Sequence, residues 1–384
     1  MPKQIVFCAD GTWNGPSDEV TTTDIDGAAQ KDTSLRDGDT NVVKLFENLR
    51  GREAGTQALQ NETELMYRDA AGTLVQAAKY IHGVGDTNNP VMKVLGGVFG
   101  AGVIARIVRG YTFISRAYEA GDAIHIVGFS RGAYTARALA GMISAVGLLD
   151  ASKYDPNNKS AAYLRGFAAW LKCKGLVFKG DEKLSSLLNA IMGLAGEAVA
   201  RAALRRGDLI PRVPIKSVAV WDTVGSMGIP NYVKGSRNDF FSFVDTKLPR
   251  AVELGFHAMA LDEQRRDFPV TRWDKDARVE QVWFVGAHAD VGGGYPLTES
   301  GLSNLALDWM TLKLAGAGVR FVKAPSGPLD PARFGQSFHT PWSRPPFNLG
   351  AKPRAPKRGD VFHDSVNDRW QADAAYRKFW PKIF

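Results

Sequence analysis

The sequence predicts an α/β protein with a mostly parallel central sheet and helices on both of its faces. Short apolar runs bounded by turn-forming residues are typical of buried strands, and four of them stand out: 5–9, 123–127, 217–221 and 282–286. The second run leads into residues 133–143, where apolar side chains recur at helical spacing. The chain has 384 residues, of which 45% are hydrophobic, so it can bury a large core. We therefore expect a single domain over residues 1–384 with insertions, rather than two smaller domains.

The loop between the second predicted strand and its helix carries the pentapeptide Gly128-Phe129-Ser130-Arg131-Gly132. A serine on a sharp strand-to-helix turn is lifted clear of the sheet, and flanking glycines avoid a clash where strand and helix converge. The bare pentapeptide also occurs as an ordinary turn in other α/β proteins, but the strand and helix around it favour a nucleophile elbow. The sequence thus predicts an α/β-hydrolase fold in which Ser130 is the nucleophile.

An oxyanion hole is expected beside Ser130. Arg131 follows the serine at the start of the predicted helix, where a backbone N–H and the helix N-terminus favour developing negative charge. Asp10 and Gly11 come directly after the first predicted strand. We expect their backbone N–H groups to complete the oxyanion hole.

Two further predicted strands end in polar loops, one beginning at Asp222 and one containing His288. The carboxyl ends of parallel strands meet at one edge of a sheet, so these loops should converge on Ser130. An α/β-hydrolase presents its triad in the order serine, acid, histidine, which Ser130, Asp222 and His288 satisfy. His288 would act as general base, and Asp222 would fix its tautomer and stabilise the imidazolium. Asp290 with His363 satisfies the same order and remains open as an alternative.

Composition and charge limit the function classes. Cys8 and Cys173 are the only cysteines, so neither a disulfide framework nor a cysteine-based zinc site is expected. The formal net charge of +8 would attract an anionic partner, but lysines and arginines are scattered and no nucleic-acid motif is present. We expect phospholipid head groups rather than nucleic acid, with an ordinary solvated surface as the alternative. Met1-Pro2-Lys3 leads directly into a strand, which predicts synthesis in the cytoplasm without a signal peptide.

Three segments are expected to lie outside the central sheet. Insertions at about 87–107 and 151–210 contain the apolar stretches Val91–Ala105 and Leu187–Ala195, each followed by arginines. Either stretch would serve as a lid or interfacial helix, or as an ordinary core helix, and both are too short to span a bilayer. Residues 324–357 are rich in Pro, Gly and Lys and predict a long surface loop.

Three other histidines have no expected catalytic role. His125 lies within a predicted strand and is expected to be a core histidine with satisfied hydrogen bonds. His82 and His257 are expected in loops or on helix surfaces.

Several motifs in order resemble one family. They are Phe7-Cys8-Ala9-Asp10-Gly11-Thr12-Trp13-Asn14, Thr40-Asn41-Val42, the serine pentapeptide with Ala133-Tyr134, Val220-Trp221-Asp222-Thr223-Val224-Gly225, residues 256–263 and residues 286–294. Together they resemble the catalytic domain of type VI secretion phospholipase effectors, family one, from near residue 5 to about 310. The resemblance implies hydrolysis of glycerophospholipid acyl esters by Ser130, Asp222 and His288, without metal or organic cofactor. It also implies export by a type VI system to a target-cell periplasm, a secretion adaptor and an immunity protein.

Two hypotheses from other classes remain open. A metal-dependent phosphoesterase would use Asp10, Asp222, His288 and Asp290 as metal ligands, with Ser130 as a phosphate contact. A non-catalytic module would use a degenerate hydrolase fold as a basic surface for docking on a membrane or protein.

Overall fold

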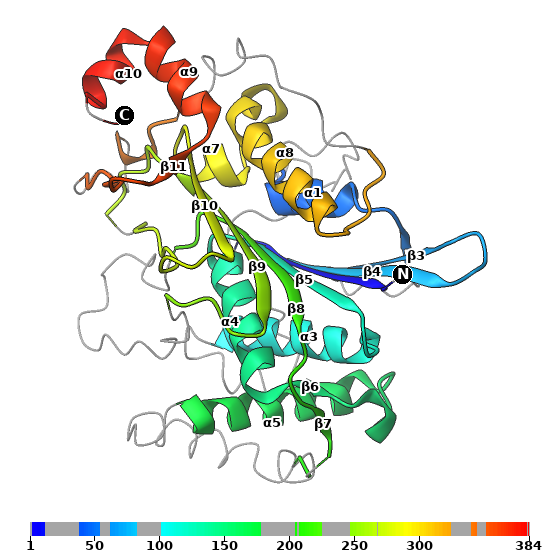
Figure 1. Ribbon diagram of the computed structural model, residues 1–384. Coiled ribbons are helices and arrows are strands. Elements are labelled where there is room, and N and C mark those ends of the chain that lie inside the picture. Colours follow the sequence, from blue (N-terminus) through cyan, green and yellow to red (C-terminus); the bar gives the residue numbers. More distant parts are fainter. Residues whose placement is uncertain are drawn as a thin grey trace, which may run out of the picture.

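The computed structural model describes residues 2–11, 38–53, 62–82, 101–177, 204–205, 207–224, 246–266, 268–323, 339–343, 351–381 and 383. Within these residues the centre is a nine-stranded sheet in the order β11-β10-β9-β8-β5-β1-β4-β3-β2 (Figure 1). The strands are β1 (Gln4–Ala9), β2 (Arg52–Glu53), β3 (Glu62–Arg68), β4 (Leu74–Ile81), β5 (Ala123–Phe129), β8 (Ile215–Trp221), β9 (Val252–Ala260), β10 (Val279–Phe284) and β11 (Val361–Phe362).

The sheet is parallel from β4 through β1, β5, β8, β9 and β10 to β11. At the other edge β3 pairs antiparallel with β4, and β2 pairs antiparallel with β3, so β3 alone opposes the direction of the other strands of this sheet. The prediction of an α/β protein with a mostly parallel sheet is therefore confirmed. The strand predicted at 282–286 instead ends at Phe284, because Gly286 adopts a φ of 108° that extended strands do not have.

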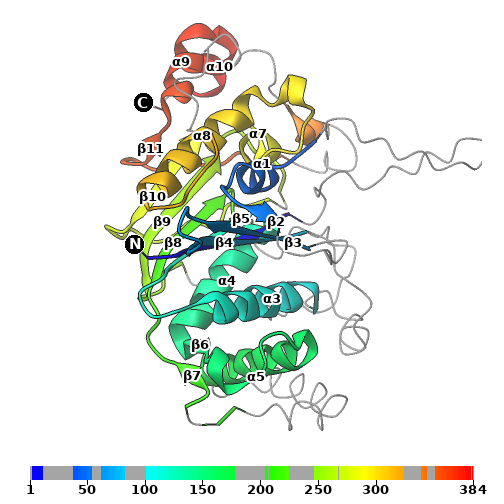
Figure 2. The ribbon, with the colours of Figure 1, turned by 90° about the vertical axis from the view of Figure 1, so that its right-hand side faces the viewer.

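Helices cover both faces of this sheet (Figure 2). On one face lie α3 (Ala101–Ala117) and α4 (Arg131–Val146), with α5 (Lys159–Val177) outside α3 and the short strands β6 (Leu148–Leu149) and β7 (Leu209–Ile210) nearby. On the other face lie α1 (Asn41–Glu47), α7 (His288–Gly292) and α8 (Gly301–Gly316). The C-terminal helices α9 (Asp364–Ala372) and α10 (Ala374–Phe379) lie near the β11 edge.

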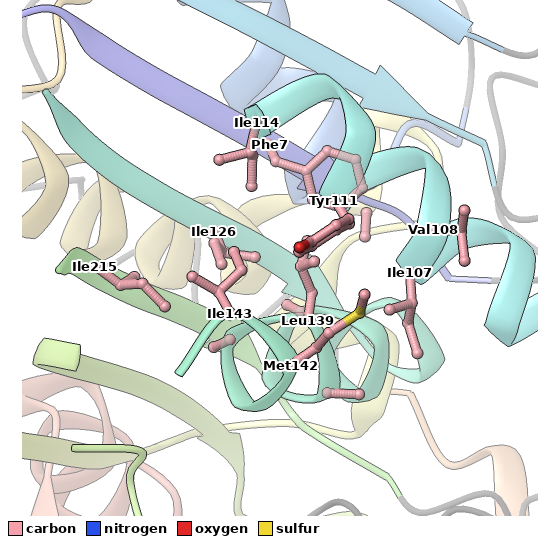
Figure 3. Close-up of a cluster of buried hydrophobic side chains, with 14 of the residues drawn as sticks. Phe7, Ile107, Val108, Tyr111, Ile114, Ile126, Leu139, Met142, Ile143 and Ile215 are labelled. Atoms are coloured by element: carbon pink, nitrogen blue, oxygen red, sulfur yellow. The ribbon is translucent and has the colours of Figure 1, made fainter. Parts of the chain in front are cut away.

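Two apolar clusters hold these layers together, one on each face of the sheet. In α3, buried apolar side chains recur every three or four residues from Ile104 onward and therefore form one helical stripe. Figure 3 shows four of them, Ile107, Val108, Tyr111 and Ile114. This stripe packs with side chains of the sheet and α4: Phe7, Ile126, Leu139, Met142, Ile143 and Ile215. Burying each large aliphatic or aromatic side chain contributes about 1.5–3 kcal/mol, so this layer fixes α4 against the sheet.

The described parts of the expected insertions are mainly structural. Residues 101–107 begin α3, where Ile104 and Ile107 are buried, so this end of the expected insertion at 87–107 is core helix rather than lid. From the insertion at 151–210, α5 packs through Phe167 and Trp170 into the same core. Residues 91–100 and Leu187–Ala195 lie outside the described residues. No helix in the described ranges is long and apolar enough to cross a membrane. The single domain over 1–384 stays a prediction.

Candidate active site

The carboxyl ends of the parallel strands bring the predicted site residues to one edge of the sheet. Asp10 follows β1, Ser130 follows β5 and Asp222 follows β8. His288 begins α7, four residues beyond the end of β10. Because all four strands run parallel, residues distant in sequence gather at this edge.

Ser130 lies on a strained turn between β5 and α4. Its φ of 58° and ψ of −121° place a non-glycine residue in a conformation that L-amino acids rarely adopt. Its backbone N–H donates to the Trp221 carbonyl at 3.1 Å, and its carbonyl accepts from Tyr134 at 3.2 Å. These bonds hold the turn in place and leave the serine hydroxyl outside the backbone hydrogen-bond network.

Asp222 and His288 form a buried hydrogen-bonded pair. His288 Nδ1 lies 2.6 Å from Asp222 Oδ2, and both side chains are nearly inaccessible to solvent. The imidazole packs 4.6 Å from the ring of Phe129 and 5.1 Å from that of Phe268, measured between centroids. Phe129 precedes Ser130, so these contacts hold the imidazole beside the serine turn. Both Ser130 and His288 are described, and no hydrogen bond joins them in this conformation.

Arg354 is a third member of this cluster, and the sequence analysis missed it. Its guanidinium binds both carboxylate oxygens of Asp222, with Nη1 to Oδ1 and Nη2 2.9 Å from Oδ2. It also donates to the carbonyls of Ala260 and Phe268. Arg354 belongs to the stretch expected as a surface loop, and its described neighbours at 351–353 and 355 are exposed while its own side chain is buried.

The charge of Asp222 is stabilised despite its burial. Burial alone would raise the pKa of the carboxyl, but the Arg354 charge and the hydrogen bond from His288 lower it below the usual range. Ala260 also donates its backbone N–H to Oδ1 at 2.9 Å. Asp222 is therefore ionised at neutral pH and can stabilise a positive charge on His288.

Glu263 orients the backbone of His288. Its buried carboxylate accepts the His288 backbone N–H at 3.1 Å and binds Arg265 through Nε and Nη2. Burial lowers the pKa of His288 below 6.5, while its hydrogen bond to Asp222 opposes this fall. The imidazole is therefore neutral at pH 7, the form in which it can accept a proton.

The expected oxyanion donors differ in their surroundings. Arg131 is the first residue of α4, where backbone N–H groups have no intrahelical acceptor. The backbone N–H of Asp10 donates to the Ile81 carbonyl at 3.2 Å. The backbone N–H of Gly11 donates to Oδ1 of Asp10 at 2.6 Å. In this conformation both of these N–H groups are already used, so the expectation for Asp10 and Gly11 does not fit the geometry.

The alternative pair of Asp290 and His363 is not brought together. Asp290 Oδ1 lies 2.6 Å from Nδ1 of His339, a residue the sequence analysis did not consider, and Oδ2 accepts from the backbone of Ala287. His363 instead caps α9, with Nδ1 2.9 Å from the hydroxyl of Ser365. Asp290 is therefore held by His339 and by the start of α7, whereas His363 is held at the start of α9.

The three histidines for which no catalytic role was expected are buried. His125 is buried, with hydrogen bonds to Ser217 at 2.8 Å and Gln4 at 2.9 Å, as predicted. The expectation of a loop or helix surface is wrong for His257, which is buried in β9 and accepts the Thr223 backbone N–H at 3.1 Å. His82 is buried just beyond β4.

The ligand set expected for a metal-dependent enzyme is not assembled. In the part of the chain that the structure describes, no three His, Cys, Asp or Glu residues are grouped so that they could hold a metal ion. Both oxygens of Asp222 are occupied by His288, Arg354 and the backbone of Ala260.

Comparisons with known proteins give one family. A family model described as "T6SS, Phospholipase effector Tle1-like, catalytic domain" matches residues 3–313. An uncharacterised protein of Saccharomyces cerevisiae, YEL023C, is 33% identical over 110 residues, which are 29% of this chain and 15% of the yeast protein.

Two solved structures are also similar. An uncharacterised protein from Pseudomonas aeruginosa has a TM-score of 0.44 and 17% identity, covering 83% of this chain and 46% of that chain. The Tle1 effector bound to the VgrG spike from the type VI secretion system has a TM-score of 0.35 and 18% identity, covering 78% of this chain and 52% of that chain. The chain thus spans about half the length of each.

Proposed function

Because the chain belongs to the Tle1-like phospholipase effectors of type VI secretion systems through their catalytic domain, we propose that it is a serine hydrolase which cleaves carboxylic esters of glycerophospholipids. One observation carries the mechanism: the buried Asp222–His288 pair lies beside the strained turn that presents Ser130. The parallel sheet and this elbow support the finer assignment of an α/β-hydrolase fold.

In the proposed reaction, the Ser130 hydroxyl oxygen attacks the ester carbonyl carbon while His288 Nε2 takes its proton. Asp222 holds Nδ1 and stabilises the imidazolium that forms. The tetrahedral oxyanion is stabilised by the backbone N–H of Arg131 at the start of α4. A second backbone donor at Gly11 would require its N–H to leave the Asp10 carboxylate.

Collapse of that intermediate breaks the bond to the glycerol oxygen, which receives the proton from His288 and leaves as a lysophospholipid. Water then attacks the acyl-Ser130 ester as His288 removes its proton, and the fatty acid departs as Ser130 is regenerated. Ser130 and His288 are not hydrogen-bonded in this conformation, and such bonds often tighten only when substrate arrives.

The geometry favours this reaction over the two alternatives. Asp222 is held by an arginine and a histidine, an arrangement suited to a charge that orients an imidazole rather than to a metal ligand. A docking module would need neither the strained serine nor the ionised buried aspartate, both of which cost stability. Export by a type VI system, an adaptor and an immunity partner are further parts of the proposal, which follow from the family. An anionic membrane as the site of action is a further part, which follows from the net charge of +8.

The first prediction compares three alanine variants. Ser130→Ala and His288→Ala should each lose nearly all release of fatty acid and lysolipid from mixed phospholipids, measured by mass spectrometry. His363→Ala should retain most of it, because His363 caps α9 through Ser365. Wild-type protein should react with a fluorophosphonate probe and Ser130→Ala should not. Labelling that persists in Ser130→Ala, or a larger loss in His363→Ala than in His288→Ala, would contradict the proposal.

A further inference from the structure

Arg106 of α3 is a buried arginine with unused hydrogen-bond donors. Its side chain is 4% exposed, and Nη2 donates to the backbone carbonyl of Asp10. Nε and Nη1 are also shielded from solvent, and no described residue accepts from them. A guanidinium has five N–H donors, and burying several of them unpaired is unfavourable unless another group completes the site. Arg106 therefore has donors on two nitrogens that a further acceptor could use.

Two more arginines, Arg109 and Arg131, add positive charge near Arg106. Asp10 is the acid beside it, but that carboxylate already accepts from Thr40, Tyr80 and Gly11, and burial raises its pKa to about 6. Burial lowers the pKa of Arg106 to about 10; Asp10 and Tyr80 oppose this fall, whereas the charges of Arg131 and Arg109 add to it. The positive charges of Arg106, Arg109 and Arg131 therefore act on one another, and positive charge at this place suits an anionic ligand.

Arg106 lies close to the backbone that carries the proposed nucleophile. The Asp10 carbonyl that Arg106 binds would lie 2.6 Å from a Cβ placed on Gly132, at the first turn of α4. A Cβ placed on Gly11 would lie 3.4 Å from Cβ of Ser130. Arg106 therefore binds the backbone of Asp10, and the backbone of Asp10 and Gly11 packs directly on the serine turn. In a glycerophospholipid, the phosphate and the acyl esters are likewise separated by only a few bonds.

We propose that Arg106 recognises the phosphate of the lipid substrate, with Arg131 and Arg109 adding to the attraction. Phosphate oxygens accept hydrogen bonds from the donors on Nε and Nη1, and this contact places an acyl ester at Ser130. The inference rests on the proposed phospholipase function and adds to it a residue that selects esters carrying a phosphate close to the scissile bond. Arg106 is a binding residue in this account and takes no part in bond breaking.

The test compares two lipids that differ only in the phosphate-bearing head group. Phosphatidylglycerol and a diacylglycerol with the same acyl chains are each presented in neutral detergent micelles. For Arg106→Met, kcat/KM on phosphatidylglycerol should fall about 10- to 100-fold, as expected for the loss of charge-assisted hydrogen bonds. Its kcat/KM on diacylglycerol and on p-nitrophenyl butyrate should stay within about threefold of wild type.

Arg116→Met is the matched control. Arg116 lies on the same helix, but it pairs with Glu64 at 2.7 Å. This variant should leave the preference between the two lipids unchanged. Equal losses on phosphatidylglycerol and diacylglycerol for Arg106→Met, or no loss on either, would overturn phosphate recognition. Wild-type protein that hydrolyses none of the three esters would instead overturn the proposed function itself.

A measurement on wild-type protein covers the case in which Arg106→Met does not fold. Glycerol 3-phosphate should inhibit p-nitrophenyl butyrate hydrolysis competitively, and glycerol at the same concentration should not. Inorganic phosphate, tested alongside, distinguishes recognition of the anion from recognition of a glycerol-linked phosphate. Equal effects of glycerol and both phosphates would contradict the proposal.

Discussion

The carboxylate of Asp222 contacts two side chains. It can orient the imidazole of His288, and it forms an ion pair with the guanidinium of Arg354. The arginine makes an ionised carboxylate tolerable in a buried position, because burying an unpaired charge costs several kcal/mol. Its positive charge also offsets part of the carboxylate charge that would otherwise stabilise an imidazolium on His288. The site therefore favours the neutral form of His288, the proposed base, in keeping with the lowered pKa of its imidazole.

The second prediction concerns pH. Because burial lowers the pKa of His288 below 6.5, wild-type kcat/KM on a neutral ester should fall on acidification with a midpoint below pH 6.5. Arg354→Met removes the positive charge beside Asp222, which favours the imidazolium of His288, so the midpoint should move to higher pH. Activity at pH 8 should also fall about 10-fold or more, because the buried carboxylate loses a partner that positions it.

Arg358→Met is the control for this prediction. Arg358 is exposed in the same segment and should keep the wild-type profile. The measurement is the pH dependence of kcat/KM for the three proteins on p-nitrophenyl butyrate. A midpoint that does not move in Arg354→Met, with activity equal to wild type, would show that the ion pair has no part in tuning the base.

At the scale of elements, the serine turn depends on the close approach of β5, β1 and α4. A Cβ on Gly128 would lie 2.4 Å from the Gly132 carbonyl oxygen, and one on Gly132 would lie 2.1 Å from the Ala9 carbonyl oxygen. Both distances are far shorter than any real contact, and the atoms met are backbone. The glycines are therefore required by helix-to-strand packing rather than by chain flexibility.

The third prediction compares two glycines of α4. Gly132→Ala should destabilise the protein by about 3 kcal/mol or more and abolish activity, since α4 must move away from β1. Gly141→Ala should raise stability by up to about 1 kcal/mol, because a Cβ there meets nothing within 4 Å and alanine favours helix. Denaturant unfolding followed by fluorescence measures both changes. Equal effects of the two substitutions would contradict this account of the elbow.

At the scale of the whole molecule, the C-terminal segment completes the site. The family model matches residues 3–313, whereas Arg354 binds Asp222 from beyond that range. Tyr376 and Trp380 of the C-terminal segment donate to Asp262, whose other contact is the backbone of Gly286 between β10 and α7. These contacts hold the loop that leads to His288. The C-terminal segment therefore helps to position the residues of the candidate site.

The fourth prediction concerns the net charge of +8 and the surface on which the protein works. Hydrolysis of one phospholipid should be faster in anionic than in neutral vesicles, because each basic residue near an anionic surface adds about 1 kcal/mol of attraction. Added salt should reduce the difference, since the Debye length is about 8 Å at physiological ionic strength. Equal rates across vesicle compositions and salt concentrations would identify the charge as an ordinary solvated surface.

The sequence by itself determined the features that depend on neighbours along the chain. The apolar runs at 5–9 and 123–127 and the pentapeptide around Ser130 predicted strands, a turn and a helix, because side-chain periodicity and glycine sterics act over a few residues. Because the ends of parallel strands meet at one edge of a sheet, Asp222 and His288 were then expected near Ser130. Chain order could not choose between this pair and Asp290 with His363, since both satisfy it.

Only the tertiary structure decided which groups meet. It pairs Asp222 with His288, gives Asp290 to His339, and brings Arg354 to Asp222 from 132 positions away in the sequence. Arg354 and the exposed Arg358 are alike as sequence, two basic residues in one polar stretch. They differ in burial, because Arg354 pairs with the buried carboxylate of Asp222 and a buried charge needs such a partner. The strands and loops that surround this pair are far apart along the chain, so the sequence does not reveal it.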